Sequence, residues 1–346
     1  FIGSFQPSAE TWIRQAIPAD LFVTSSAKVA GVQNQPMAAS VGDELAKFEF
    51  VDALDRVRVY PADVLGLRVF IISLIPEIYE RRGKPTVLSG SLPTPEERAK
   101  DIVTISENFA RRRSLKVGDV FEVKTPTGVH PWKVGAVIID YTSDQGSIII
   151  ERSHFTRQFN DDQVDSYHLY VDDPSKIETV RQRVTERFGK SFDLYVLSNS
   201  ELRDEAMNLV GSAFKVTWAM EVVSVLLALL GIINTLLAAV LDRTREIGLL
   251  RAIGADRRHV LKLFAAEASF IGLTGGLMGV GVGAVVGYVL TKVVGVQATG
   301  WSFPFQFPWI TAVQMLLIAI VASTLAGLYP ARRASRLDVV EALAYE

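Results

Sequence analysis

The stretch Asp242–Lys262 reads D-R-T-R-E-I-G-L-L-R-A-I-G-A-D-R-R-H-V-L-K and lies between two long runs that contain no charged residue. Uncharged runs extend over Val222–Leu241, Ala268–Thr291 and Trp309–Tyr329. A helix rises about 1.5 Å per residue, so about 20 residues cross a hydrocarbon core of about 30 Å. Apolar helices buried in soluble proteins are usually shorter. The sequence therefore predicts three transmembrane helices.

The distribution of basic residues predicts the orientation of these helices, because Lys and Arg are retained on the cytoplasmic side. The basic side chains of the first connector are Arg243, Arg245, Arg251, Arg257, Arg258 and Lys262. The tail after Tyr329 is also rich in Arg, whereas residues 292–308 contain only Lys292. We therefore expect the first connector and the tail inside, the second connector outside, and residues 1–217 on the extracytoplasmic side of the membrane.

Composition excludes several classes of function. The net charge is −2, with no basic stripe outside the first connector, so we expect no nucleic-acid partner. The chain has no Cys, which excludes disulfides, thiolate zinc sites and a Cys nucleophile. His130, His154 and His168 lack metal-ligand spacing and are expected to have surface or structural roles. No catalytic residue, metal site or bound cofactor is predicted.

Two separate stretches of the region before the first membrane helix, 1–75 and 163–197, share a pattern of short strands and helices. The first carries predicted strands at Asp20–Thr24, Arg56–Tyr60 and Leu67–Leu74 and a helix over Met37–Ala53. The second carries predicted strands at Tyr167–Val171 and Asp193–Leu197, with a helix over Pro174–Phe188. This order predicts one α+β domain of the split βαβ kind.

Residues 76–162 interrupt this domain and are predicted to form an inserted β-rich subdomain. A strand at Ile102–Ile105 is followed by a helix from the cap Ser106 to Arg113. Strands are then expected over Val120–Lys124, Trp132–Asp140 and Ser147–Ile150.

The rest of the chain follows as an all-α region of three membrane helices. The expected segments are a stalk helix at 198–217, membrane helices at 218–241, 264–291 and 309–329, a cytoplasmic segment at 242–263, an extracytoplasmic connector at 292–308 and a cytoplasmic tail at 330–346. Glu221 and Glu267 lie near the ends of two spans, where an ionisable group is either functional or reaches the interface. Both explanations stay open.

The basic connector has a pattern of its own. Thr244 can cap a short helix whose apolar side includes Ile247, Leu250 and Ile253. Gly254 is placed to end that helix and Asp256 to cap the next one. A loop that only follows the positive-inside rule would explain the arginines but not the apolar side.

Glycines in the second span recur every four residues at Gly275, Gly279, Gly283 and Gly287. Such a stripe of small residues lets another helix approach closely. We expect it to form a helix-packing or dimer interface.

Three motifs in the second half resemble one family. They are E-I-G-L-L-R-A-I-G-A at Glu246–Ala255, L-x-x-x-E-A-S at Leu263–Ser269 with its glycine-rich span, and Y-P-A-R-R-A-S-R-L-D-V-V-E-A-L at Tyr329–Leu343. Residues 206–346 are similar to the permease region of bacterial ABC transporters of the FtsX/MacB/LolC type, also called type VII. I-S-E-N-F-A at Ile105–Ala110 and L-K-V-G-D at Leu115–Asp119 are similar, more weakly, to the extracytoplasmic domain of that family, with its porter-like part and its β-rich insert.

The resemblance implies a coupling helix that contacts an ATPase. Its residues in this chain are Arg245, Glu246, Ile247, Gly248, Leu249, Leu250, Arg251, Ala252, Ile253 and Gly254. The sequence contains no G-x-x-x-x-G-K-[ST] loop, so we expect ATP and Mg on a partner dimer of ABC ATPase subunits rather than on this chain. Other implied partners are a second permease subunit or a missing N-terminal half, a periplasmic or outer-surface protein, and membrane lipid.

The family pattern has one span more than this sequence, and Phe1 does not begin a signal peptide, so we expect a segment to precede it. Two functions remain open. The chain is either a permease subunit that uses ATP hydrolysis to move its outer domain, for export or extraction of lipoprotein, lipid, peptide or drug, or a membrane-anchored sensor that regulates a cell-envelope partner without transport. An apolar docking side on the connector favours the first.

Overall fold

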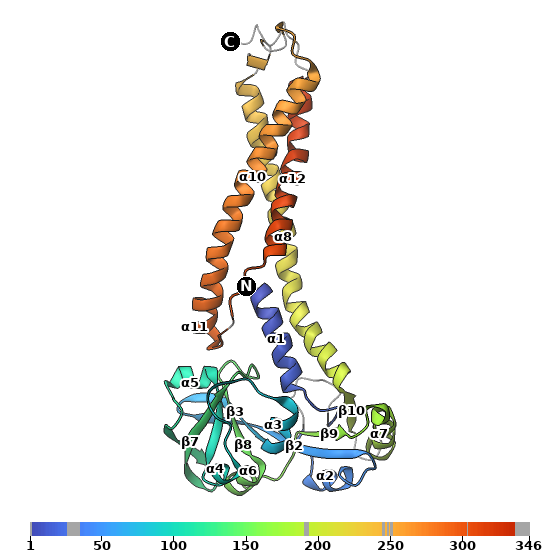
Figure 1. Ribbon diagram of the computed structural model, residues 1–346, viewed down its shortest axis with the longest axis vertical. Coiled ribbons are helices and arrows are strands. Elements are labelled where there is room, and N and C mark those ends of the chain that lie inside the picture. Colours follow the sequence, from blue (N-terminus) through green and yellow to red (C-terminus); the bar gives the residue numbers. More distant parts are fainter. Residues whose placement is uncertain are drawn as a thin grey trace. The chain divides into compact units, whose positions relative to one another are not determined.

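The protein is described here from a computed structural model (Figure 1). It describes all residues except 1, 26–34, 190–193, 244–245, 248, 250–251, 303 and 336–346. The chain divides into two compact units. The sheet unit contains residues 5–211 and 291–304, and the helical unit contains residues 1–4, 212–290 and 305–346.

The sheet unit is built on a mixed β-sheet. Within the described residues, ten strands join in the order β10-β1-β9-β2-β3-β8-β5-β7-β4, with β6 paired to β7. The strands are β1 Leu21–Thr24, β2 Val51–Val64, β3 Leu67–Leu74, β4 Val87–Gly90, β5 Ile102–Ser106, β6 Val120–Thr125, β7 Gly128–Ile138, β8 Ser147–Glu151, β9 Ser166–Val171 and β10 Tyr195–Ser198. Strands of the predicted α+β domain and of the predicted insert thus share one sheet, joined by the parallel pair β3 and β8.

Seven helices precede α8 among the described residues. They are α1 Ile2–Ala16, α2 Ala39–Leu45, α3 Pro76–Gly83, α4 Pro95–Arg98, α5 Glu107–Arg113, α6 Arg152–Phe159 and α7 Ile177–Val184, with shorter helical turns at Pro174–Lys176 and Thr185–Gly189. The α+β fold expected before the membrane helices is confirmed.

Side chains of successive strand residues point to opposite faces, and this alternation gives the sheet two kinds of face. One face of β1 and β9 is packed with Leu21, Val23, Tyr167 and Leu169, which join Val180 of α7 in a buried cluster. A second cluster surrounds Trp132, Phe109 and Phe155 in the region of the predicted insert. The alternate residues of β9, Ser166, His168 and Tyr170, point to the other face, where they line a cavity.

The helical unit contains three helices long and apolar enough to cross a membrane, among the described residues. The three helices are α8 Asn199–Asp242, α10 Arg257–Val289 and α12 Trp309–Ser335. Their candidate spans are Lys215–Ala239, Arg257–Thr299 and Trp309–Arg332, which confirms the expectation of transmembrane helices. After α10 the chain continues through a turn of π-helix at Leu290–Val294 into α11, Gly295–Thr299. Figure 1 shows α10 and α12 side by side.

Some expected elements differ from the structure. The helix predicted over Met37–Ala53 is only α2, Ala39–Leu45, and β2 begins at Val51 because Val51–Val57 pairs with β9. Tertiary pairing here outweighs local helix propensity. Helix α1, which contains Pro7, was not predicted. Helix α12 also runs past the expected end of its span, through Pro330 to Ser335.

Candidate functional site: the coupling segment and the ends of helix α10

The basic connector between α8 and α10 has helical structure where it is described. Backbone N–H groups of Ile247 and Ile253 donate to the carbonyls four residues earlier, Arg243 and Leu249, at 3.0 and 3.1 Å. Gly254 then adopts φ +106°, a conformation that costs glycine little, and the chain turns. Asp256 stands at the N-cap of α10. The turn at Gly254 and the start of the next helix thus lie where the sequence placed them.

Ile247 anchors this segment to the helical unit. Its side chain is 3% exposed and packs in a cluster with Val260 and Phe264 of α10 and Ala331 of α12. Among the residues predicted to contact an ATPase, Ile247 therefore faces the chain's own helices. Its burial holds the connector against the inner ends of two spans.

Two other apolar side chains of the segment point away from the chain. Leu249 is 57% exposed and Ile253 is 76% exposed. Glu246 and Ala252 are also exposed. The remaining predicted contact residues, Arg245, Gly248, Leu250 and Arg251, lie outside the described residues. Leu249 and Ile253 therefore form an exposed apolar surface, and the buried Ile247 fixes the position of the segment that carries it.

Glu267, whose role the sequence left open, has a partner. Its carboxylate lies 3.6 Å from a guanidinium nitrogen of Arg243, so it joins the inner end of α10 to the end of α8. Both side chains are partly exposed, which makes the pair weak. Glu221 has no ion-pair partner among the described residues.

Only some of the glycines of α10 form close contacts with another helix of the chain. A side chain at Gly272 would place its Cβ 2.0 Å from Oγ of Ser323, and one at Gly276 would meet Leu316 at 2.7 Å. These two glycines, which the four-residue stripe omitted, form the close contact with α12. At Gly275, Gly279 and Gly283 a Cβ would meet nothing within 4 Å. Gly279, Gly283 and Gly287 instead line a groove between α10 and α12.

The other end of α10 continues into a connector, residues 291–304, that belongs to the sheet unit. Ser302 donates two hydrogen bonds to the carboxylate of Glu107 at the start of α5, from its hydroxyl at 2.6 Å and from its backbone N–H at 3.1 Å. Arg112 of α5 donates to the carbonyl of Ala298 at 2.8 Å. The connector is therefore fastened along α5.

Close packing accompanies these polar contacts. Gly300 has φ +75°, and a Cβ there would lie 2.6 Å from Cβ of Asn108. The ring of Trp301 lies 5.2 Å from that of Tyr141. Glu107 and Asn108 belong to the I-S-E-N-F-A motif, so the sequence marked one side of this contact. Nothing in the sequence pattern marked residues 298–302 as the other side.

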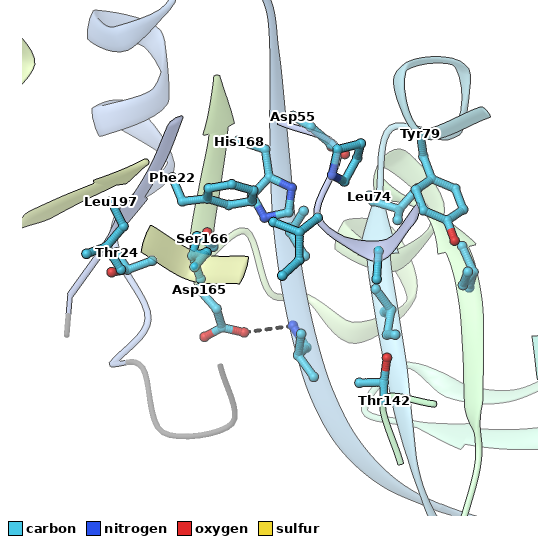
Figure 2. Close-up of a pocket in the computed structure, with 18 of the residues that line it drawn as sticks. Phe22, Thr24, Asp55, Leu74, Tyr79, Thr142, Asp165, Ser166, His168 and Leu197 are labelled. Atoms are coloured by element: carbon cyan, nitrogen blue, oxygen red, sulfur yellow. Dashed lines mark hydrogen bonds between the residues drawn. The ribbon is translucent and has the colours of Figure 1, made fainter. Parts of the chain in front are cut away.

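Three histidines of the sheet unit, His130, His154 and His168, have different surroundings. His154 is buried, with Nδ1 2.8 Å from Oδ1 of Asp101, and His130 lies 3.1 Å from the hydroxyl of Thr127. His168 points into the cavity beside Phe22 (Figure 2). Among the described residues no group of three metal-ligating side chains comes together.

Comparison with known proteins adds family relationships to this geometry. Residues 218–339 match the model of the FtsX-like permease C-terminal family. The chain is an ABC transporter permease of the FtsX and MacB type. The resemblance inferred from the sequence motifs is confirmed. The matched range contains the second and third spans, most of the first span, the coupling segment and the connector.

Two relatives of this FtsX-type permease are longer proteins. An uncharacterized ABC transporter permease protein of Mycobacterium tuberculosis is 26% identical over 350 residues, which is 100% of this chain and 41% of the relative. The macrolide export ATP-binding/permease protein MacB of Bdellovibrio bacteriovorus is 30% identical over 290 residues, covering 78% of this chain and 43% of that protein. This chain thus spans less than half the length of either.

A solved structure of the periplasmic region of MacB from Actinobacillus actinomycetemcomitans aligns with 57% of this permease and 96% of that chain, at 13% identity and a TM-score of 0.44. The three apolar helices and the family match make this permease a membrane protein.

Proposed function

We propose that this chain is a permease subunit that couples ATP hydrolysis on a partner ATPase dimer to movement of its extracytoplasmic domain. The observation that carries the proposal is the coupling segment, where Leu249 and Ile253 stay exposed while Ile247 fixes the segment to α10 and α12. A membrane anchor or sensor without an ATPase partner has no use for apolar side chains held in this way. A docking partner would bury them.

Motion of the helices can reach the sheet unit by two covalent routes. One is α8, which is continuous from Asn199 to Asp242 and enters the sheet unit through its first turns. The other is the connector 291–304, which follows α10 and is bound to α5 by Glu107 and Arg112. We propose that a push on the coupling segment moves α10 and that the connector passes this displacement to α5.

The names of the MacB relatives describe macrolide export, which makes a drug the first cargo to test, beside peptide, lipid and lipoprotein. The glycines that stay open on α10 are available to a helix of a second permease subunit or of another part of a longer protein. In this proposal residues 1–217 lie outside a bacterial inner membrane, and ATP with Mg binds to the partner ATPase. A periplasmic or outer-surface protein is a further partner of the moving domain.

The test is ATPase activity of the co-purified membrane complex with Leu249→Asp and Ile253→Asp combined. Two carboxylates on this surface should release the ATPase or remove its stimulation by the permease. Val120→Asp is the matched control, because Val120 is 59% exposed but lies on β6 of the sheet unit. Unchanged association and activity in the double variant would refute the coupling role and favour the sensor.

A further inference from the structure

A cavity of about 240 Å³ lies in the sheet unit, on the face of the sheet opposite the cluster under α7. Its floor is formed by alternate residues of neighbouring strands, and its rim by the end of α1 and by α3. Lining residues used below are Phe22, Asp55, Val57, Val59, Tyr79, Asp140, Asp165, His168 and Tyr170. Figure 2 shows His168 beside Phe22 on one side of the cavity and Tyr79 beside Leu74 on the other.

The wall is mainly apolar, but it includes four polar side chains with polar atoms that are unpaired among the described residues: a carboxylate oxygen of Asp55, the ring nitrogens of His168 and the hydroxyls of Tyr79 and Tyr170. Asp55 is 2% exposed, and its Oδ1 accepts from the backbone N–H groups of Arg56 and Ile75, both at 2.8 Å. Its Oδ2 accepts no hydrogen bond among the described residues. The same is true of the His168 ring and of the hydroxyls of Tyr79 and Tyr170. Asp55 and Tyr170 are buried, whereas Tyr79 and His168 are half-buried. Buried polar groups normally have a hydrogen-bond partner, so the free carboxylate oxygen of Asp55 and the groups around it can bind a ligand in the cavity.

The charge of the lining is one-sided. Asp55, Asp140 and Asp165 line the cavity, whereas no Lys or Arg does so among the described residues. Asp165 is paired with Arg58 at 2.7 Å, and Asp140 accepts hydrogen bonds from Thr142 and Ser147. Asp55 has no ion pair within 4 Å among the described residues. Asp140 has no ion pair either, but both of its oxygens accept hydrogen bonds, whereas Oδ2 of Asp55 accepts none among the described residues.

We propose that this cavity binds a small cationic amphiphile, with its ammonium group on Asp55 and its apolar body among Val57, Val59 and Phe22. The hydroxyls of the two tyrosines and the neutral ring of His168 can orient the polar end. Size limits the ligand, since an apolar cavity of ~150 Å³ holds one benzene ring. A ring with a short aminoalkyl chain suits the volume found here. The site does not depend on coupling to ATP.

Titration of Asp55 gives the site a predicted pH dependence. Burial raises the pKa of Asp55 to about 7, although two backbone hydrogen bonds oppose the shift. A cation binds the ionised carboxylate, so affinity for an amine should rise from pH 6 to pH 8 and then level off. Burial lowers the pKa of His168 to about 4, so that ring stays neutral over this range. The charged and titratable groups around Asp55 are Arg56, Glu77, Tyr79, Asp140, Arg152, Asp165, His168 and Tyr170.

The experiment is isothermal titration of the full chain in detergent with three probes of one carbon skeleton: 3-phenylpropylamine, 3-phenylpropan-1-ol and 3-phenylpropanoate. We expect the amine to bind at pH 8 about tenfold more tightly than the alcohol, and the carboxylate not to bind. Asp55→Asn keeps the shape and the acceptor oxygen but removes the charge. It should cut amine affinity about tenfold, remove its pH dependence and leave alcohol binding unchanged. Asp63→Asn, an exposed change on the same strand, is the matched control.

A second variant makes the result independent of Asp55. Val57→Phe fills the cavity and should abolish binding of the amine and the alcohol together, with the fold checked by its melting temperature. The proposal is overturned if the amine and the alcohol bind equally, if Asp55→Asn leaves amine affinity unchanged, or if no probe binds and the cavity holds only water.

Discussion

The two ends of α10 are joined to their neighbours by different kinds of interaction. At the inner end, Phe264 and Val260 bury Ile247 in an apolar cluster. The connector that follows the other end is held by directed hydrogen bonds from Ser302 to Glu107. Apolar packing is roughly indifferent to direction, whereas hydrogen bonds need fixed geometry. In the proposed function, the apolar contact would hold the coupling segment in place, and the hydrogen-bonded contact would respond to a small displacement of the connector.

The largest expected effect is at the inner end. Phe264→Ala removes a ring that is 2% exposed and should lower the free energy of unfolding by about 3–5 kcal/mol. Thermal unfolding of the purified chain in detergent measures it. Phe270→Ala, at a site 65% exposed on the same helix, is the control. Equal losses in both would mean that the apolar cluster does not hold the segment.

The glycine contact between α10 and α12 comes next. Gly272→Ala places a methyl group 2.0 Å from Oγ of Ser323 and 2.8 Å from the carbonyl of Ala319, which should cost about 1–3 kcal/mol. Gly279→Ala puts the same methyl group into open space. Melting temperatures of the two variants should therefore differ, with Gly279→Ala close to wild type. If Gly279→Ala is the more damaging change, another helix packs there.

At the connector, Gly300→Ala should destabilise the contact by about 1–3 kcal/mol, because φ +75° is unfavourable for Ala and its methyl group would meet Asn108. Gly118→Ala has a comparable φ of +96° with nothing within 4 Å, so it shares only the backbone cost. Hydrogen exchange of residues 291–304 should accelerate in the first variant alone. Similar exchange in both would show that the close approach does not matter.

The smallest effect is expected for Glu107→Gln. The amide keeps one acceptor oxygen, so one of the two bonds from Ser302 and the ion pair with Arg111 are lost, at a cost of about 1–2 kcal/mol. In the ATPase complex we expect normal association but weaker transmission to the outer domain, read as loss of transport or of effector activation. Glu122→Gln, an exposed change on β6, should have no effect. Loss of ATPase association in Glu107→Gln would contradict this division of roles.

Local features of the sequence predicted much of the architecture. Uncharged length predicted the spans, and the pair Gly254 and Asp256 predicted a turn followed by a helix start, because both follow from backbone chemistry at single residues. The sequence was a poorer guide to which side chains of a helix are buried and which are exposed. Ile247 and Ile253 appear equivalent in sequence, but one is buried and the other exposed, since the rotation of the segment depends on α10 and α12. The choice of Gly272 over Gly275 for the α12 contact has the same cause.

Long-range contacts left almost no trace in the sequence. Glu107 and Ser302 are 195 residues apart, and no periodicity links them. The cavity is similar, because Asp55 of β2 and His168 of β9 meet only once the strands pair, with Asp55 opposite His168 in the register. His168 was expected to have a surface or structural role because it lacks metal-ligand spacing. A lone histidine on a strand does not reveal which face of the sheet it occupies.

Successive residues of β9 point to opposite faces of the sheet, so residues that stabilise the fold alternate with residues that line the cavity. Odd-numbered positions, Tyr167 and Leu169, hold the fold together, while even-numbered positions, Ser166 and His168, line the cavity. Substitutions at even positions can therefore alter what the cavity accepts with little effect on folding. Insertion of a single residue into the strand would exchange the two sets at once. If the cavity binds the proposed amine, its ligand preference can diverge between relatives by point mutation, whereas the length of β9 must stay fixed.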